Sequence, residues 1–599
     1  MIRVSNGTCR WRILAVVIAV VAGCSLRLDG MELEAPGREG SAGYGAAPRL
    51  VMAFYYPWYG VTDGPGGAGS TVHWGRIDAA KKDIAASTHY PALGAYDSYD
   101  RDVIEQHCKW ARQAGVDTLI SSWWGHGDYT DKPLGTILDI CAAHDMTACI
   151  YYETAPNPKT AERTAEDIVR VLERYGRHEG YLRVGGKPVV FVYGRAVQQL
   201  GLTGWLKAVE AIQQRYAPGC IVMGDQFSYG AARVFDGLHT YNTAGSLSGK
   251  TPREVAQWAE GTYASWVDLA DSAGKISTIT VIPGYDDTKI RTPGLAVERY
   301  GGRLYHAQWE KAIKADPHWV VITSFNEWHE GSEIEPSHED GSKYLRITGE
   351  YARRFKSKPR IVACKAGASS ISVDEKRALA RKYEGKRIAV LADAESMAFW
   401  WLLDAGVEMD ILSWGDIAAG KLKTDAYAMV LYCAGETYTQ TVDEQGDVDK
   451  ALLEYLSNGG TLVAAPSLPW PFYRKADGEP INNSARFGIT LRMGFENPPA
   501  GAELYFVQPK MRMKHVPERF GFPESGDLRW RAFVEREQEA YTPLLELRDA
   551  NGESLGDAVV FAELPNGGKV GYIWFGLLHG QRAEGVLYDA FDFVAGRLD

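Results

Sequence analysis

Short apolar, β-branched runs alternate with longer amphipathic stretches from residue 50 to residue 356, and this alternation constrains the fold more than any other feature. Each short run is bounded by Gly, Pro, Asn or Asp, as buried strands are. Eight strands that alternate with helices over about 310 residues predict a (β/α)8 TIM barrel. The predicted strands are residues 50–56, 116–124, 147–153, 188–193, 220–225, 236–242, 276–283 and 319–322.

The amphipathic stretches predict the helices that cover this barrel. We expect the barrel domain to span residues 48–358. The predicted helices are residues 101–114, 134–144, 161–175, 204–216, 252–273, 305–315 and 342–356.

A second, smaller domain is predicted for residues 387–599, after a linker at 359–386 that carries a short helix. Strands at 387–392, 408–413, 427–433 and 460–466, with helices between them, indicate a flavodoxin-like α/β fold with a parallel sheet. After Ala502 further strands dominate, and a last helix is expected at 583–595.

The eighth barrel strand runs into a cluster of chemically active side chains. Asn326, Glu327, Trp328, His329 and Glu330 follow it directly. Active sites of (β/α)8 barrels are built from side chains at the C-terminal ends of the strands. Paired carboxylates beside aromatic rings indicate glycosidic bond cleavage. The alternative is that the two carboxylates form surface ion pairs and the indole belongs to the core.

The other predicted strands also end in aromatic rings, carboxylates and amides. Any one of these residues is as easily explained by packing, but together they would surround one face of the barrel. Aromatic planes and polar groups suit the stacking and hydrogen bonding of sugars. The set includes Tyr55, Tyr56, Trp123, Trp124, Tyr151, Tyr152, Glu153, Tyr193, Asp225, Tyr241, Asn242, Tyr285, Asp286 and Asp287.

Charge argues against a nucleic-acid partner. Lys plus Arg number 65 and Asp plus Glu number 76, so the net charge is −11. Nucleic-acid binding requires a basic face. No Cys/His cluster has the spacing of a zinc site, so we expect neither a metal nor another cofactor.

The N-terminus predicts export as a lipoprotein. Arg3, Arg10 and Arg12 precede an apolar run of about ten residues, which is too short to span a bilayer. The run ends in Val-Ala-Gly-Cys at Cys24, which resembles a bacterial lipobox. We expect residues 1–23 to be a signal peptide, Cys24 to be the lipidation site, and residues 24–47 to be a flexible tether. The predicted location is the outer membrane or the periplasm, and the alternative is an ordinary secretory signal.

Six cysteines remain beyond Cys9 and Cys24, without paired spacing. We expect mostly buried free thiols, although export leaves disulfides open. These six are Cys108, Cys141, Cys149, Cys220, Cys364 and Cys433.

The barrel region resembles glycoside hydrolase family 99, the endo-α-mannosidases. The longest matching motif is ITSFNEWHEGSEIE at 322–335. FYYPWYG at 54–60, HW at 73–74, YPALGAYDSY at 90–99 and PGYDDTKIR at 283–291 also match, in the family's order. The resemblance covers roughly residues 50–357.

The resemblance implies endo-hydrolysis of α-mannosidic linkages in mannan or mannose-rich glycans, with retention. It also implies an unusual mechanism, in which the sugar's own 2-hydroxyl attacks the anomeric carbon to give a 1,2-anhydro sugar. By motif position, Glu327 resembles the base and Glu330 the acid/base. We expect Trp328 and Glu327 to raise the pKa of Glu330.

Other residues are implied as substrate contacts by the same resemblance. Trp124 stands where bacterial members have Ser-Trp-Trp, which goes with mannosyl-mannose. Gly75, Glu333 and the loop at 61–71 depart from the family pattern, which leaves the exact linkage open. The expected contacts are Tyr55, Tyr56, Trp124, Glu153, Tyr241, Tyr285, Arg291, Asn326, Trp328 and His329.

The second domain looks like the glutamine-amidotransferase-like domains attached to some sugar hydrolases. Cys433 ends a strand there but has no nucleophile-elbow sequence, so we expect it to be structural. Two other functions stay open: a glycoside hydrolase for a different polysaccharide, and a non-catalytic glycan-binding lipoprotein.

Overall fold

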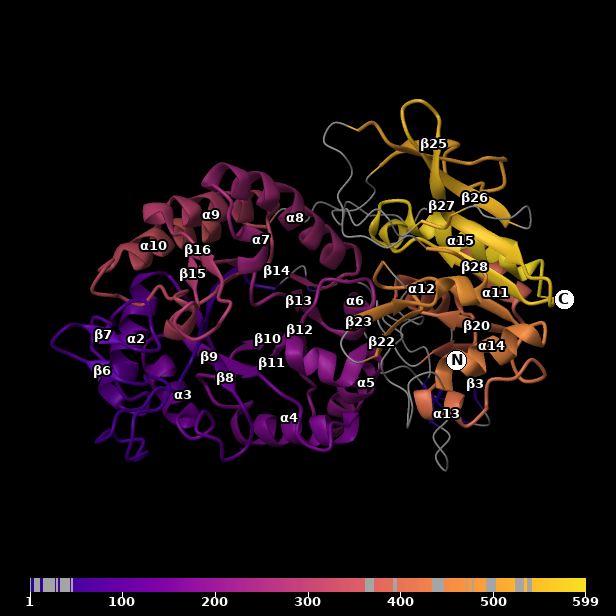
Figure 1. The fold of residues 1–599 in the computed structure, drawn as a ribbon. Helices are drawn as coiled ribbons and strands as arrows, with labels where there is room; N and C mark the ends of the chain where they lie inside the picture. The colour runs from indigo at the N-terminus through magenta and orange to yellow at the C-terminus, as the bar shows by residue number, and fades with distance from the viewer. Residues whose placement is uncertain are drawn as a thin grey trace. The chain divides into compact units, whose positions relative to one another are not determined.

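The computed structural model describes residues 44, 47–360, 371–391, 396–433, 447–469, 471–476, 479–491, 502–522, 533–535 and 541–598, with short stretches at 2–4, 11–13, 27–28 and 31–32. The chain forms two compact units (Figure 1). One unit is Ala42–Ala366, and the other combines Met1–Ser41 with Gly367–Asp599.

Eight parallel strands of the first unit close into a barrel, as predicted. The strand order is β11-β12-β13-β14-β17-β5-β8-β9, and β9 pairs again with β11 to complete the ring. These strands are β5 (Leu50–Tyr55), β8 (Thr118–Trp123), β9 (Thr147–Tyr152), β11 (Lys187–Val192), β12 (Ile221–Asp225), β13 (Gly237–His239), β14 (Ile276–Val281) and β17 (Trp319–Ile322).

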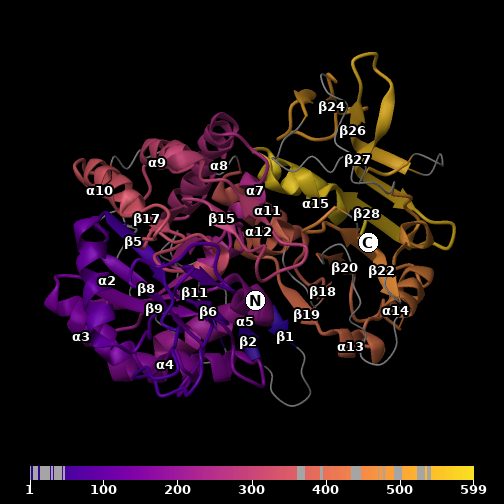
Figure 2. The same ribbon diagram turned by 60° about the vertical axis from the view of Figure 1, so that its left-hand side comes forward.

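Helices surround the strands on the outside (Figure 2). Thr251 and Glu254 form a capping box at the start of α8, and Thr160 caps α4. Such caps satisfy the free N–H groups of the first turn. The helices are α2 (Arg101–Gln113), α3 (Leu134–Ala143), α4 (Ala161–Tyr175), α5 (Gly194–Arg215), α6 (Ala231–Val234), α7 (Ala244–Leu247), α8 (Pro252–Ser272), α9 (Arg303–Ala315) and α10 (Lys343–Lys356).

The start of α5 was wrong in the sequence prediction, which placed it at residue 204. The helix begins at Gly194 and is interrupted at Gly201, whose φ is 64°. A positive φ interrupts the helical spacing of apolar residues, so the part of α5 before Gly201 lacks the sequence pattern that predicts a helix. The earlier start puts Arg195 directly beyond the C-terminal end of β11.

Aromatic rings fill the barrel interior. Phe54 on β5 and Phe191 on β11 have ring centroids 6.5 Å apart, although their strands do not pair. Phe191 also contacts His239 at 4.9 Å and Trp319 at 6.1 Å. All four are fully buried, so the interior is a packed core rather than a pore.

The second unit is an α/β domain built on a mixed sheet, in line with the predicted fold class. From residue 388 onward the parallel strands, numbered in chain order, lie in the order 2-1-3-4-5, which is the flavodoxin-like arrangement. Four antiparallel strands extend the sheet beyond β28. In sheet order the strands are β19 (Met409–Leu412), β18 (Ile388–Leu391), β20 (Met429–Tyr432), β21 (Thr461–Ala464), β28 (Lys569–Ile573), β27 (Ser554–Glu563), β26 (Tyr541–Arg548), β24 (Tyr505–Val507) and β25 (Arg519–Gly521).

The helices of this unit include one in the predicted linker, α11. At the other edge of the sheet, β1 (Ile2–Val4) pairs with β19, and β2 (Trp11–Ile13) pairs with β1. The helices are α11 (Val373–Lys382), α12 (Met397–Ala405), α13 (Trp414–Ala418), α14 (Asp447–Ser457) and α15 (Ala583–Ala595).

Five cysteines are described, and all five are buried free thiols, as expected. Burial raises the pKa of Cys433 to about 12, which fits a structural residue rather than a nucleophile. Cys24 and Cys364 lie outside the described residues, so the lipoprotein assignment stays a prediction. Among the described residues, no helix is both long and apolar enough to span a bilayer.

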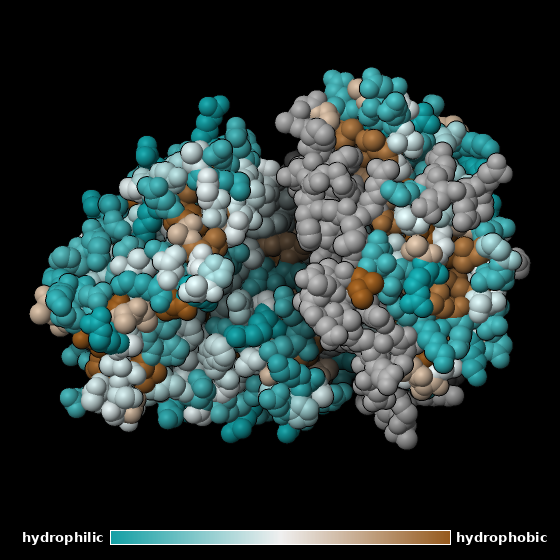
Figure 3. Space-filling view, in the orientation of Figure 1, coloured by the Kyte–Doolittle hydropathy of each residue, from teal (hydrophilic) through white to brown (hydrophobic). Residues whose placement is uncertain are grey.

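The surface of the barrel unit is mainly hydrophilic on the face shown in Figure 3, with scattered hydrophobic patches. This agrees with the burial of most large aromatic side chains in the core.

Replacing Phe191 by Ala tests the packed interior. We expect the free energy of unfolding of the barrel unit to fall by about 3–5 kcal/mol, because a large buried ring leaves a cavity. Differential scanning calorimetry that resolves the two units measures it. Met511→Ala in the second unit is the control, since this side chain is 66% exposed. An unchanged barrel transition in Phe191→Ala would contradict the packing described.

Candidate active site

The loop after β17, residues 323–337, carries both predicted catalytic carboxylates and is fastened to the end of β5 by Asn326. The backbone N–H of Tyr56 donates to Asn326 Oδ1 at 2.7 Å, and Asn326 Nδ2 donates to the Tyr56 carbonyl at 3.1 Å. One amide thus satisfies both backbone groups of Tyr56 and fixes the loop against the first strand. Asn326 is fully buried, and its expected contact with substrate stays a prediction.

A buried polar network supports the loop from below. Trp328 Nε1 donates to Glu335 Oε2 and to the Tyr96 hydroxyl, both at 3.1 Å. The Tyr96 hydroxyl donates to Glu335 Oε2 at 2.8 Å, and His107 Nε2 lies 3.1 Å from Glu335 Oε1. Trp328 is fully buried in this network and supports the loop, and its expected contact with substrate stays a prediction.

Tyr55 belongs to the same network, and its expected contact with substrate stays a prediction. Its hydroxyl lies 3.1 Å from Nδ1 of His107 on α2, and the side chain is fully buried. Successive side chains of a strand point to opposite faces. Phe54 and Tyr56 therefore face the barrel interior and its mouth, while Tyr55 faces the helical layer.

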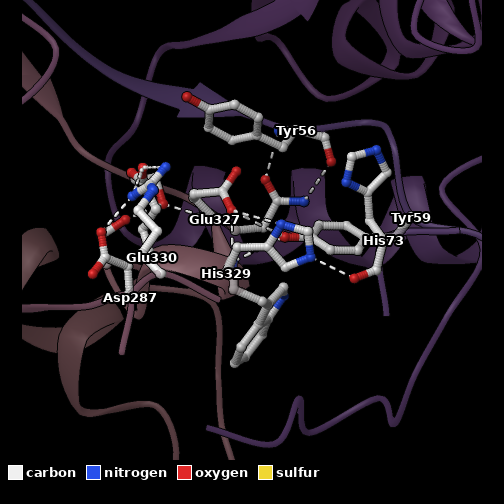
Figure 4. Close-up of polar contacts among 12 residues, drawn as sticks. Tyr56, Tyr59, His73, Asp287, Glu327, His329 and Glu330 are labelled. Carbon is white, nitrogen blue, oxygen red and sulfur yellow. Dashed lines mark hydrogen bonds and ion pairs between the residues drawn. The ribbon is translucent and has the colours of Figure 1, made fainter. Parts of the chain in front are cut away.

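Glu327 is the more deeply placed of the two carboxylates (Figure 4). Its side chain is 2% exposed, and its Oε1 accepts from the backbone N–H of His329 at 3.1 Å and from the Tyr59 hydroxyl at 3.5 Å. Its Oε2 is buried and has no hydrogen-bond partner among the described residues. Burial first, and then the charge of Glu330, raises the pKa of Glu327 well above its usual value.

Glu330 stands at the same site with its carboxylate held by two polar side chains. The Tyr241 hydroxyl donates to Glu330 Oε2 at 2.7 Å, and both terminal nitrogens of Arg291 donate to Oε1 at 3.2 Å. The side chain of Glu330 is 12% exposed, against 2% for that of Glu327.

Arg291 is itself fixed by the loop after β14. It donates to the Tyr285 hydroxyl at 2.7 Å and also bonds to Asp287, and Tyr285 donates to Asp287 Oδ2 at 3.0 Å. Figure 4 shows Asp287 beside Glu330. Asp287 was not among the predicted contacts, although its place after the seventh strand was the available signal.

Glu153 brings a third carboxylate from the end of β9. Its Oε1 accepts from the Ser122 hydroxyl at 2.7 Å, and its Oε2 accepts from Arg195 at 3.2 Å. Burial raises the pKa of Glu153 to about 7, against the opposing effects of Ser122 and Arg195. Trp124 is close by, because its Nε1 donates to Ser122 Oγ at 3.1 Å.

All three carboxylates lie near the hydroxyl group of Tyr56, and two of them lie near that of Tyr241. Burial raises the pKa of Tyr56, and Glu153, Glu327 and Glu330 raise it further. The pKa of Tyr241 is likewise raised by burial, by Glu330 and by Glu327. The loops after β9 and β17 therefore converge on one site.

Two histidines, His73 and His329, and one tryptophan, Trp58, form a further group of rings at the site. The rings of Trp58 and His73 stack with centroids 4.5 Å apart, and His329 Nε2 bonds to the His73 carbonyl. Burial lowers the pKa of His329, and burial with the neighbouring His329 lowers that of His73 to about 4. Both rings are therefore neutral at neutral pH. Trp58 and His73 are not among the expected contacts, although both lie in aromatic motifs.

Of the ten expected contacts, seven lie at this site and three beneath it. The three buried supports are Tyr55, Asn326 and Trp328. No group of His, Cys, Asp and Glu among the described residues has the arrangement of a metal site. The residues at the site are Tyr56, Trp124, Glu153, Tyr241, Tyr285, Arg291 and His329.

A (β/α)8 barrel with carboxylates converging among aromatic rings at its strand ends defines a glycoside hydrolase. The family model for glycosyl hydrolase family 99 matches residues 47–348, about half of the chain. The chain belongs to this family.

Individual relatives cover the same region. The glycoprotein endo-alpha-1,2-mannosidase of Rattus norvegicus is 27% identical over 367 residues, which is 52% of this chain and 76% of that protein. An endo-alpha-1,2-mannosidase-like protein of Homo sapiens is 25% identical over 366 residues, 51% of this chain and 75% of that protein. A solved structure of a GH99 endo-alpha-mannosidase from Bacteroides thetaiotaomicron is 27% identical, covers 52% of this chain and 99% of that chain, and has a TM-score of 0.44.

Replacing Asn326 by Ala tests whether this amide positions the catalytic loop. We expect the free energy of unfolding to fall by about 1–3 kcal/mol, since both backbone groups of Tyr56 lose their partners. We also expect kcat to fall, because the loop carries both carboxylates. Thermal unfolding and initial-rate kinetics measure the two effects. Asn551→Ala, in an exposed turn of the second unit, is the control. Unchanged stability and kcat in Asn326→Ala would show that the loop holds its place without this contact.

Proposed function

We propose that the chain is a retaining, endo-acting α-mannosidase for mannan or mannose-rich glycans. The observation that supports this most directly is the free, buried Oε2 of Glu327, at a site shared with Glu330. The Rattus norvegicus relative that matches the barrel is a glycoprotein endo-alpha-1,2-mannosidase, which supports the choice of linkage.

In the proposed first step, Glu327 takes the proton of the sugar's 2-hydroxyl. The 2-oxygen attacks the anomeric carbon while Glu330 protonates the leaving oxygen, so the glycosidic bond breaks and a 1,2-anhydro sugar forms. In the second step Glu330 takes a proton from water, the water oxygen attacks the anomeric carbon, and Glu327 returns its proton to the 2-oxygen. Two inversions at one carbon give net retention.

The placement of the two carboxylates suits this sequence of steps. A nucleophilic carboxylate would have to face the general acid across the scissile bond, at about 5–5.5 Å. A base for the 2-hydroxyl has no such requirement, so both groups can come from one loop. The raised pKa of Glu327 makes its carboxylate a stronger base toward a sugar hydroxyl than an exposed Glu would be.

Glu330→Ala and Glu327→Gln test the proposal on defined glycans. We expect the wild type to release oligosaccharides from yeast-type α-mannan, and each variant to lose at least about 10³-fold in kcat while it stays folded. Glu260→Gln is a matched control, because Glu260 lies on the outer helix α8 and pairs with Lys311 at 2.7 Å. Full activity in Glu330→Ala would refute the assignment of the acid.

Product analysis separates this proposal from its two alternatives. Cleavage of another polysaccharide, with α-mannans untouched, would show a different substrate class. Binding of glycan without any release of oligosaccharide would show a non-catalytic binding protein. NMR of the first anomer released should show retention.

We also propose that the protein is exported and anchored by a lipid at Cys24. The support is the N-terminal sequence alone, with its basic start, short apolar run and lipobox-like end. In a bacterial expression host, wild-type protein should incorporate labelled palmitate and partition with membranes. Cys24→Ala should abolish both. Labelling that persists in Cys24→Ala would place the lipid elsewhere.

A further inference from the structure

Arg195 reaches the active site from α5, which begins before its predicted start at residue 204. It is the second residue of α5, just beyond the C-terminal end of β11. Its Nε donates to the Glu153 carbonyl and its Nη2 to Glu153 Oε2, both at 3.2 Å. Its side chain is 42% exposed, whereas that of Glu153 is 4% exposed. A half-exposed cation therefore holds a buried carboxylate by two separate bonds.

The same guanidinium lies over the ring of Trp124. The distance from Arg195 Cζ to the Trp124 centroid is 4.4 Å, and to that of Tyr193 it is 5.3 Å. A guanidinium at this distance from an indole face is attracted by the ring quadrupole. The guanidinium of Arg195 thus covers one face of Trp124.

Ser122 closes the arrangement into a ring of contacts. Its hydroxyl donates to Glu153 Oε1 at 2.7 Å and accepts from Trp124 Nε1 at 3.1 Å. The backbone N–H of Trp124 donates to Thr130 Oγ1 at 3.0 Å. Ser122 and Arg195 therefore each contact both Trp124 and Glu153 and link the two side chains.

We propose that Arg195 is a positioning residue that locks Trp124 and Glu153 in one relative orientation and so sets which sugar unit this side of the site accepts. The inference rests on the proposed function, since it concerns the same glycan. Arg195 acts through its two neighbours, Glu153 and Trp124. The planar shape of its guanidinium matters as much as its charge, because only a guanidinium can donate two hydrogen bonds to Glu153 and also stack on an indole.

The positive charge of Arg195 makes this arrangement depend on pH. Arg195 favours the ionised form of Glu153, whose pKa is about 7. Without Arg195 that pKa rises, so the acidic limb of kcat/KM moves to higher pH. The other charged or titratable groups that act on Glu153 or respond to it are Glu327, Glu330, Tyr56, Tyr151 and Tyr193.

The test compares Arg195→Met and Arg195→Lys with wild type on a glycan that the wild type cleaves. For Arg195→Met we expect KM to rise about tenfold, kcat to change less, and the acidic limb to move up by about one pH unit. For Arg195→Lys we expect a raised KM, with the acidic limb of kcat/KM near its wild-type position, since the charge remains but the planar guanidinium is lost.

Arg354→Met is the matched control, because Arg354 also stacks on a ring, that of Tyr351 at 4.8 Å, on the outer helix α10. It should leave KM and the pH profile unchanged. If Arg195→Met lowers only the melting temperature, with the same KM and pH profile per folded enzyme, Arg195 is merely structural and the proposal is overturned.

A crystal structure of unliganded Arg195→Met keeps this inference separate from the proposed function. We expect Trp124 or Glu153 to leave its wild-type rotamer, whatever the substrate is. Both side chains unmoved would overturn the proposal even if mannan is cleaved. Conversely, a wild type inactive on every α-mannan would refute the proposed function while the structural arm still decides the role of Arg195.

Discussion

The site depends on the way one acidic loop is fastened to the barrel by buried polar contacts. Asn326 satisfies both backbone groups of Tyr56, and Glu335 accepts from Trp328 and Tyr96 beneath the loop. A buried polar group that loses its partner costs about 1–3 kcal/mol, so these contacts favour one loop conformation strongly over others. Because Glu327 and Glu330 belong to that loop, their positions follow from groups that never touch a substrate. The network also explains why the motif is long: its supports and its reactive residues alternate along the same stretch.

Several carboxylates at one site repel one another, and the protein gives each of them a different environment. Glu327 has a free oxygen and a raised pKa, Glu153 is held by a hydroxyl and a guanidinium, and Glu330 is held by Tyr241 and Arg291. Unequal environments give chemically similar groups different roles, as acid–base chemistry at one pH requires. The neutral histidines nearby add no charge to this balance.

The barrel and the mixed sheet of the second unit could be predicted from the sequence, because strand-helix alternation is a local pattern. The direction of single side chains could not. Tyr55 and Tyr56 are adjacent tyrosines at a strand end, yet one contacts α2 and the other faces the site, since neighbouring residues of a strand point to opposite faces. Trp328 looked like a site residue because it separates the two carboxylates, but its indole has its partners in the core. Arg195 was missed because Gly201 interrupts the helix that begins beside it.

The central claim is that Glu327 and Glu330 serve a single sugar unit, one at its 2-hydroxyl and the other at the departing oxygen. A crystal structure of Glu330→Gln with an uncleaved α-mannooligosaccharide examines this most directly. The account predicts the 2-hydroxyl within about 3 Å of Glu327 Oε2 and the glycosidic oxygen within hydrogen-bonding reach of residue 330. A bound sugar whose 2-hydroxyl points away from Glu327, or whose glycosidic oxygen lies beyond the reach of residue 330, would contradict it.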